Sequence, residues 1–176
     1  MKLCLLALTL LLSPPPNGVR TTPDQLIPAA QRKPAADFTL PDNYGRPLTL
    51  SAYKGKVVLL DFWATWCGGC KLELPWYIQF DRQYRDHGLA VVGVSMDDDG
   101  MKVVKPFLAR KHILYPVVIG SETLGKSFGL GQMPLTLLID RQGRIALAHP
   151  GVVDRTDFER HIQQLLREPG RRTALS

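Results

Sequence analysis

The sequence predicts an α/β domain with a mixed central β-sheet flanked by helices. Two almost unbroken apolar runs of strand length, one starting at Val57 and one at residues 90–95, lie on either side of a stretch with helical apolar periodicity. Two strands joined through a helix pair in parallel with a right-handed crossover. The turn at residues 140–143 joins the apolar segments 135–139 and 145–147 as antiparallel neighbours, so the predicted sheet is mixed.

A β-hairpin is expected before the central strand. Apolar and polar residues alternate in segments 38–40 and 47–50. The residues between them, 42–45, include the Asp, Asn and Gly that are typical of a turn. Lys54-Gly55-Lys56 separates these segments from the central strand. The hairpin is therefore the N-terminal element of the predicted domain.

The first 35 residues are expected to lie outside the folded domain. Met1 and Lys2 precede an apolar run, residues 3–12, that is too short to cross a bilayer as a helix. A secretory signal is therefore favoured, with an uncleaved membrane tether as the alternative. Residues 17–34 are rich in proline and polar side chains, which is typical of a linker. The expected organisation is a signal peptide or tether plus linker at 1–35, a domain at 36–168 and a flexible basic tail at 169–176.

Helices and short strands are expected to alternate after the second parallel strand. Helical patterns occupy residues 103–108 and 124–128, with a short apolar strand at 116–119 between them. Residues 97–100, Asp-Asp-Asp-Gly, lack the alternating ligands and the glutamate of a calcium loop. They are expected to form a solvated loop that caps the next helix. Residues 156–159 fit a capping box, which predicts the start of the last helix.

The composition argues against several classes of function. The chain has 22 lysines and arginines against 16 acidic residues, a net charge of +6. The basic residues are scattered and carry no interleaved aromatics, so nucleic acid is not an expected partner. The 3 cysteines are too few for a disulfide scaffold. The histidines show no ligand spacing, so neither a metal nor another cofactor is expected.

Cys67 and Cys70 form the strongest functional signal. The central strand ends just before Cys67, and a helical pattern begins at the pair. The first sulfur therefore lies at a helix N-terminus, where unpaired N–H groups and the helix dipole lower its pKa. Cys70 lies one turn further in and can close a disulfide with Cys67, which makes a reversible redox site. A zinc site would need a second ligand pair, and a c-type haem site would need histidine in place of Lys71.

Residues 62–70 carry a resemblance to a known family. Their sequence, Phe-Trp-Ala-Thr-Trp-Cys-Gly-Gly-Cys, followed by Pro75, resembles the thioredoxin superfamily, in particular the extracytoplasmic thiol-disulfide oxidoreductases of the TlpA/ResA type. The resemblance covers residues 36–168 and implies a thioredoxin-like fold with an inserted element before Met133. Gly69 departs from the family, in which most members have proline before the second cysteine. The redox potential of the family therefore does not transfer to this chain.

The resemblance also implies a substrate-binding surface around the two cysteines. Met133-Pro134 stands where the superfamily has a cis-proline, whose preceding backbone pairs with an extended substrate peptide. Trp66 is expected to shield the sulfurs, whereas Trp63 is expected in the core. The residues expected to contact substrate are Trp66, Gly68, Gly69, Met133 and Pro134.

Two acidic residues near the cysteines are candidate catalytic groups. Asp61 is a carboxylate inside an apolar strand, and by resemblance it aligns with the buried acid behind the second cysteine of thioredoxin. Burial would raise its pKa, so that it could take the proton of Cys70. Glu73 matches an acidic position near the dithiol of ResA-type proteins, or is a plain helix-surface residue. The candidate catalytic set is Cys67, Cys70, Asp61 and Glu73.

These features predict a thiol-disulfide oxidoreductase that acts in the periplasm or elsewhere outside the cytoplasm. Cys67 would attack a client disulfide, and Cys70 would resolve the mixed disulfide. By resemblance, the clients are exported proteins, such as those of cytochrome c maturation or metal-site assembly, and a membrane thiol transporter supplies the electrons. The alternatives are a disulfide-forming oxidant that uses the same site, or a metal carrier with the two cysteines as ligands.

Overall fold

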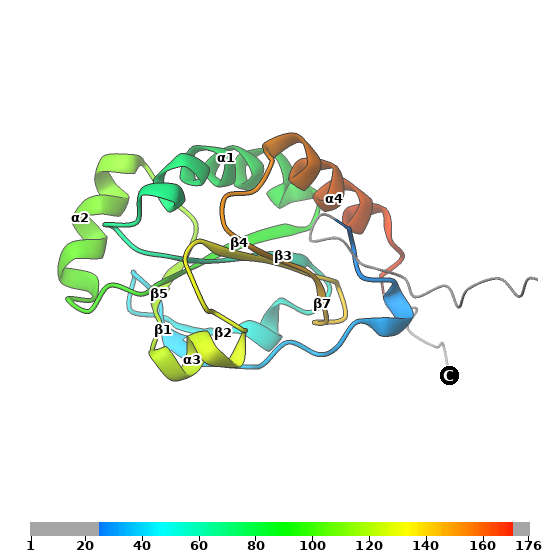
Figure 1. The fold of residues 1–176 in the computed structure, drawn as a ribbon, viewed down its shortest axis with the longest axis horizontal. Helices are drawn as coiled ribbons and strands as arrows, with labels where there is room; N and C mark the ends of the chain where they lie inside the picture. The colour runs from blue at the N-terminus through cyan, green and yellow to red at the C-terminus, as the bar shows by residue number, and fades with distance from the viewer. Residues whose placement is uncertain (1–24, 171–176) are drawn as a thin grey trace, which may run out of the picture.

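A five-stranded mixed sheet forms the centre of the structure, a computed structural model that describes residues 25–170 (Figure 1). In order across the sheet, its strands are β5 (Val117–Ile119), β4 (Leu89–Ser95), β3 (Val57–Trp63), β6 (Leu135–Ile139) and β7 (Ile145–Pro150). β3, β4 and β5 pair in parallel, whereas β6 pairs antiparallel with β3 and with β7. The predicted mixed sheet, with its parallel pair joined through a helix, is confirmed.

Both faces of the sheet are covered because the central strand is apolar on both faces. Side chains alternate along β3, so Leu59 and Trp63 pack on one face and Leu60 and Phe62 on the other. The first face carries the helices α1 (Gly68–Tyr84), α2 (Met101–Lys111) and α4 (Arg155–Arg167). The second face carries α3 (Glu122–Ser127) and the hairpin of β1 (Thr39–Pro41) and β2 (Pro47–Thr49) (Figure 1).

The elements around the central strands agree with the sequence predictions. β1 and β2 form the expected N-terminal hairpin, with Leu40 opposite Leu48. The inserted element between β4 and Met133 consists of α2, β5 and α3. Gly88 follows the 3-10 turn Arg85–His87 that comes directly after α1, and it adopts the left-handed conformation, with φ of 97°, which suits a glycine at a helix end. Short 3-10 turns lie at Ala29–Gln31, Leu50–Tyr53 and Arg85–His87.

The start of α4 differs from the sequence prediction. Asp154, not Thr156, is the N-cap residue, and its carboxylate accepts the N–H of Asp157 at 2.9 Å. The predicted capping box at residues 156–159 is therefore wrong. Aspartate caps a helix at least as well as threonine, and Asp154 lies at the spacing that reaches this N–H.

Residues 26–35, which the composition predicts to be a linker, lie against the folded domain. The N–H of Ile27 donates to a carbonyl of β7 at 2.8 Å. The guanidinium of Arg32 is buried and bridges Asp140 at 3.2 Å and Glu168, which follows α4, at 2.6 Å. This segment is fixed because its arginine meets two carboxylates, a pairing that composition does not reveal.

The predicted signal or tether at the N-terminus and most of the predicted basic tail lie outside the described residues, which are 25–170. Within that range, no helix has both the length and the apolar character needed to cross a membrane.

Candidate active site

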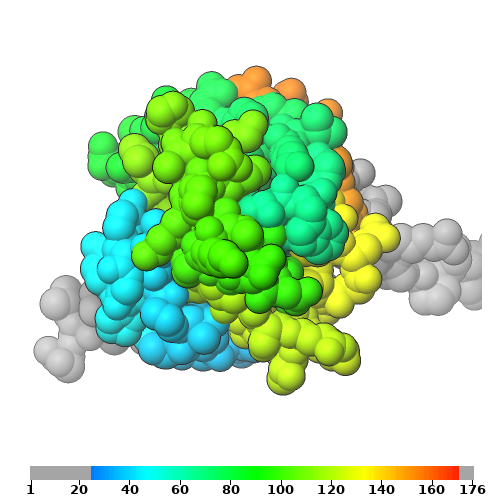
Figure 2. Space-filling view, turned by 90° about the vertical axis from the view of Figure 1, so that its left-hand side faces the viewer, coloured from blue at the N-terminus to red at the C-terminus, as the bar shows by residue number. Residues whose placement is uncertain are grey.

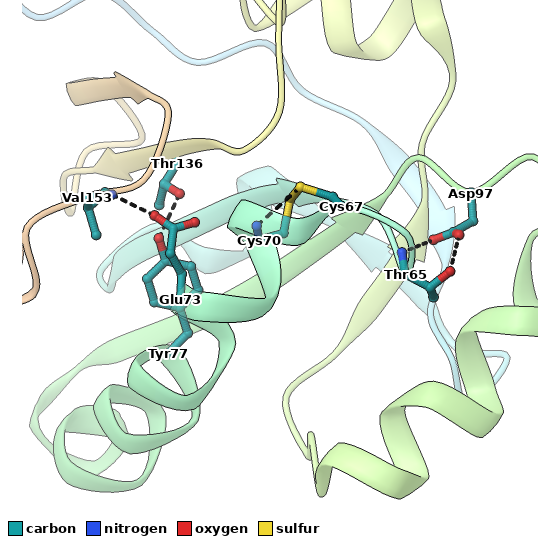
Figure 3. Close-up of a disulfide and its surroundings, with 8 residues drawn as sticks. All are labelled: Thr65, Cys67, Cys70, Glu73, Tyr77, Asp97, Thr136 and Val153. Carbon is teal, nitrogen blue, oxygen red and sulfur yellow. Dashed lines mark hydrogen bonds between the residues drawn. A yellow bond between two sulfur atoms is a disulfide. The ribbon is translucent and has the colours of Figure 1, made fainter.

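Cys67 and Cys70 lie where β3 passes into α1. Cys67 is the N-cap of α1, and its sulfur accepts the Cys70 N–H at 3.2 Å (Figure 3). The two sulfurs form a disulfide. Cys67 is 7% exposed, whereas Cys70 is completely buried. A reaction partner in solution therefore reaches Cys67 first, and the N–H groups at the helix start favour a thiolate there.

Asp97 fixes the loop that precedes the disulfide. Its carboxylate accepts the Thr65 N–H at 2.9 Å, the Thr65 hydroxyl at 2.5 Å and the Ser95 hydroxyl at 2.8 Å (Figure 3). The predicted solvated loop at residues 97–100 is wrong for Asp97, which is buried, and α2 begins without a side-chain cap. The cause is the parallel pairing of β3 and β4, whose last residues are register partners, so the residues that follow them meet.

The cis-proline loop lies against the first turn of α1. The Met133-Pro134 peptide bond is cis. A Cβ placed on Gly69 would lie 3.2 Å from Cδ of Pro134 and 3.1 Å from Cγ2 of Val152. Because glycine lacks that atom, α1 can approach both this loop and the segment after β7. The carbonyl of Pro134 accepts the N–H of Gly151 at 2.8 Å, which ties the loop to that segment.

An apolar surface borders the disulfide. Trp66 is 65% exposed and Val152 is 43% exposed, and Met133 is half-buried. Gly68 is exposed and has no heavy atom within 4 Å of a Cβ placed on it. In Figure 2 the teal surface at the start of α1 adjoins the yellow surface of the chain near the cis-proline loop. An extended polypeptide could therefore lie across this surface and pair with backbone beside Cys67.

Two buried carboxylates lie in the layer between β3 and α1. Asp61 is 1% exposed and points to the same face of β3 as Leu59 and Trp63, which pack on the α1 side of the sheet. Glu73 of α1 is completely buried, and its Oε1 accepts the N–H of Val153 at 2.7 Å (Figure 3). The surface interpretation of Glu73 is therefore wrong.

A tyrosine and a threonine extend this buried polar group. The hydroxyls of Tyr77 and Thr136 share a hydrogen bond of 2.8 Å, and Thr136 on β6 is the register partner of Asp61. Figure 3 shows Glu73, Tyr77 and Thr136 grouped on the side of α1 that faces the sheet. Burial raises the pKa of Tyr77 well above its usual value, and the nearby carboxylates raise it further. Tyr77 therefore remains a neutral hydroxyl within this group.

Burial also controls the acid–base behaviour of the two carboxyls. It raises the pKa of Asp61 well above the usual value, and the charge of Glu73 acts in the same direction. Burial raises the pKa of Glu73 to about 7, against the lowering effects of the Val153 N–H and the Tyr77 hydroxyl. Glu73 can thus hold or release a proton near neutral pH, and Asp61 stays protonated at pH values where an exposed aspartate would not.

Sequence reasoning missed several residues that shape the site. Glu73 and Tyr77 share a helix face with Cys70, a spacing that could have indicated the burial of Glu73. Asp97 and Thr65 follow directly on two strands predicted to be parallel neighbours, which could have indicated their contact. The residues missed are Thr65, Tyr77, Asp97, Thr136, Val152 and Val153. Across residues 25–170, no three His, Cys, Asp or Glu side chains gather as metal ligands would.

Known proteins resemble this chain in both sequence and fold. A family model described as the AhpC/TSA family matches residues 32–148. The chain belongs to the AhpC/TSA family. Thiol-disulfide oxidoreductases named ResA from Geobacillus thermodenitrificans and Geobacillus kaustophilus are 32% and 33% identical over 132 residues, which cover 74% of this chain and 75% of each relative.

The fold of this AhpC/TSA-family chain also has close counterparts among solved structures. A Chlorobium tepidum protein described as a thiol:disulfide interchange protein DsbE has a TM-score of 0.71 and 34% identity, covering 77% of this chain and 96% of that chain. The thioredoxin-like fold and the resemblance to ResA-type proteins are thereby confirmed. The protein is a thiol-disulfide oxidoreductase with a Cys67–Cys70 disulfide.

Proposed function

We propose that this oxidoreductase acts outside the cytoplasm and reduces disulfides in exported client proteins. The proposal depends on the unequal exposure of the two cysteines: Cys67, at a helix N-terminus, is 7% exposed, whereas Cys70 is completely buried. The surface beside Cys67 is apolar, as a polypeptide-binding surface often is, since Trp66 and Val152 both expose large apolar side chains. A client in the form of an extended chain suits this surface better than a small thiol does.

The reaction would proceed by two thiol-disulfide exchanges. The Cys67 thiolate attacks one sulfur of the client disulfide, so the client S–S bond breaks, a Cys67–client bond forms and the other client sulfur leaves as a thiolate. The Cys70 thiolate then attacks the Cys67 sulfur, which breaks the mixed disulfide and releases the second client sulfur. Two electrons pass to the client, and the protein is left with the Cys67–Cys70 disulfide.

The second exchange would require a base, because burial raises the pKa of a thiol such as Cys70. Asp61 is the proposed acceptor of that proton, since it is buried on the α1 side of β3 and has a raised pKa. Glu73, which interacts with Asp61 and titrates near neutral pH, is proposed as the second group in the transfer. Tyr77 and Thr136 would hold the two carboxyls in a fixed polar environment.

The client chain would bind on the surface around Cys67. The backbone of Met133, before the cis-proline, is proposed to pair with the client in extended form. Trp66 and Pro134 would flank the client side chains next to its cysteine. Gly68 and Gly69 would allow the client backbone to approach the first turn of α1.

Export and re-reduction complete the proposed cycle. The apolar run at residues 3–12 supports a role for residues 1–35 as a secretory signal or membrane tether with a linker. The oxidised protein would then need a membrane thiol transporter as its electron donor. Clients of cytochrome c maturation or of metal-site assembly are the proposed substrates.

Trapping of mixed disulfides tests the proposal. The Cys70→Ser variant should accumulate mixed disulfides through Cys67, because the resolving thiol is missing, and Cys67→Ser should accumulate none. Mass spectrometry of the mixed disulfides, recovered from cells that express and export the Cys70→Ser variant, would identify the clients. Equal trapping by both variants would contradict the assigned roles.

The reduction potential separates a reductant from an oxidant. A reduction potential of about −270 mV, as in thioredoxin, supports the reductant, whereas one of about −120 mV, as in DsbA, supports a disulfide-forming protein. Equilibration of the purified protein with glutathione buffers measures it directly.

A further inference from the structure

A basic hollow lies beside the disulfide, between α1 and α2. Its volume is about 420 Å³, and Thr65, Pro106 and Phe107 form part of its lining. Three cations also line it, Lys71 of α1 and Lys102 and Arg110 of α2. Figure 2 views this side of the molecule, with lime-green α2 beside the teal start of α1. Two of the lining residues, Thr65 and Lys71, flank the two cysteines in the sequence.

The cations of this hollow are not neutralised by acidic side chains of the part of the chain that the structure describes. Within residues 25–170, none of the three cations forms an ion pair, and the hollow has no acidic lining residue. The Asp97 carboxylate accepts hydrogen bonds from the N–H and the hydroxyl of Thr65. Asp98 lines a separate hollow together with Glu122. Arg110 lies over the ring of Phe107 at 5.9 Å, so an arginine fork and an apolar ring stand side by side.

The hollow is also close to the reacting sulfur along the chain. Thr65 lies two positions before Cys67, so their Cα atoms are at most about 8 Å apart. Lys71 follows Cys70 directly. An extended chain advances about 3.3 Å per residue, so roughly two to three residues separate a client cysteine at Cys67 from side chains in the hollow.

We infer that the hollow receives carboxylates of a client protein, from a segment that flanks the client cysteine. Three cations that form no ion pair among residues 25–170 complement an acidic segment, and a guanidinium binds a carboxylate with two parallel hydrogen bonds. Pro106 and Phe107 supply apolar contact for the stems of glutamate side chains. The inference rests on the proposed function and names the class of client: proteins whose reducible cysteine has acidic residues nearby.

Matched disulfide peptides test this inference. We would prepare three peptides that differ only in the residues flanking one cysteine, which are Glu, Gln or Lys, and measure kcat/KM for their reduction by the full chain. Each exposed ion pair contributes at most about fivefold. Because more than one glutamate can pair with the hollow, the Glu peptide should be reduced about tenfold faster than the Gln peptide. The Lys peptide should be the slowest, and the preference should shrink as salt is added.

Two triple variants of equal charge separate the hollow from the overall charge. Lys71→Gln/Lys102→Gln/Arg110→Gln should abolish the Glu-to-Gln preference. The control Lys33→Gln/Lys56→Gln/Arg82→Gln removes the same charge away from the hollow and should retain it. The ratio between peptides is the readout, because the loss of Lys71 can change the thiol pKa for every peptide alike.

The outcomes distinguish this inference from the proposed function. Equal reduction of the Glu and Gln peptides by the wild type, or an equal loss of preference in both triple variants, would overturn the inference alone. Failure of the wild type to reduce any peptide would overturn the proposed function, and the inference with it. Binding to phosphatidylserine vesicles that only the hollow variant loses, without a peptide preference, would assign the hollow to a membrane surface instead.

Discussion

Glu73 in α1 accepts a hydrogen bond from the backbone N–H of Val153 at 2.7 Å, although the two residues are 80 positions apart in the chain. The bond fastens the first turns of α1, which contain Cys70, to the segment between β7 and α4. The same carboxyl is completely buried, and its pKa is raised to about 7. One side chain therefore holds the site in place and titrates in the pH range in which thiols exchange.

Replacement of Glu73 by glutamine should flatten the pH dependence of stability. Folding raises the pKa of Glu73 from 4.5 to about 7, so the folded chain holds this proton more tightly than the unfolded chain does. The wild-type free energy of unfolding should fall as the pH rises across that interval, by up to about 3 kcal/mol, and then level off. Urea denaturation of the oxidised proteins at several pH values measures both slopes.

The difference between the two slopes reports Glu73 together with its charge effect on Asp61, which is present in both proteins. Glutamine keeps an oxygen that can accept the Val153 N–H, so the packing contact is retained. Glu122→Gln, at an exposed position on α3, serves as the control for a glutamate-to-glutamine change outside the site. Parallel curves for wild type and Glu73→Gln would show that Glu73 does not titrate as argued.

Replacement of Asp61 by asparagine should slow the resolving step more than the first attack. The variant removes a proton acceptor in the buried layer next to α1, whereas Cys67 keeps its exposure and its helix N-terminus. Burial raises the pKa of Asp61, so the wild-type resolving rate should increase with pH through that raised value. Stopped-flow reduction of a peptide disulfide separates the two steps. An unchanged resolving rate, with only stability altered, would make Asp61 a structural residue.

Replacement of Asp97 by alanine should loosen the loop before the disulfide. The change leaves the N–H of Thr65 and the hydroxyl of Ser95 without their acceptor, which should cost about 2 kcal/mol of stability. It should also lower kcat/KM for a peptide disulfide, because Thr65 and the residues after it lose their fixed position. Asp97→Asn should be milder, since an amide can accept the N–H and donate to the Thr65 hydroxyl.

The exposed neighbour Asp98 provides the control for Asp97. Asp98→Ala removes the same charge from the same loop and should change neither stability nor kcat/KM. Denaturant titration and peptide kinetics of the three variants give both quantities. If Asp97→Ala behaves like Asp98→Ala, the loop is held by other contacts.

Most of the fold could be predicted because it follows from patterns local to each segment. The apolar run from Val57 and the alternation at the hairpin identify strands whichever partners they find. Cys67 and Cys70 could be placed because a strand-to-helix junction fixes which sulfur lies at the helix start. Each of these inferences needs only residues close together in the chain.

The remaining features depend on pairs of residues that are distant in the chain. Arg32 is fixed by Asp140 and Glu168, which are 108 and 136 positions away, so the predicted linker composition did not indicate its place. The burial of Glu73 depends in the same way on a backbone N–H far along the chain. Local capping patterns predict that Asp97 caps the next helix. Its carboxylate instead accepts the N–H of Thr65, which follows another strand.

Gly69 lies close to the cis-proline loop. The N–H that donates to the Cys67 sulfur is that of Cys70, the residue after Gly69. A methyl group at position 69 would instead lie 3.2 Å from Cδ of Pro134 and 3.1 Å from Cγ2 of Val152, so one of these neighbours has to shift. Either shift disturbs the surface on which we propose that clients bind.

Gly69→Ala should therefore impair the reduction of peptide disulfides by up to about tenfold, because displacements well below 1 Å already affect the alignment of reacting groups. Reduction of a small linear disulfide such as 2-hydroxyethyl disulfide should change little, since it does not need the wider surface. Gly131→Ala is the control, because a Cβ there meets no atom within 4 Å. Equal losses for peptide and small disulfide would mean that Gly69 acts on the sulfurs themselves and not on the client surface.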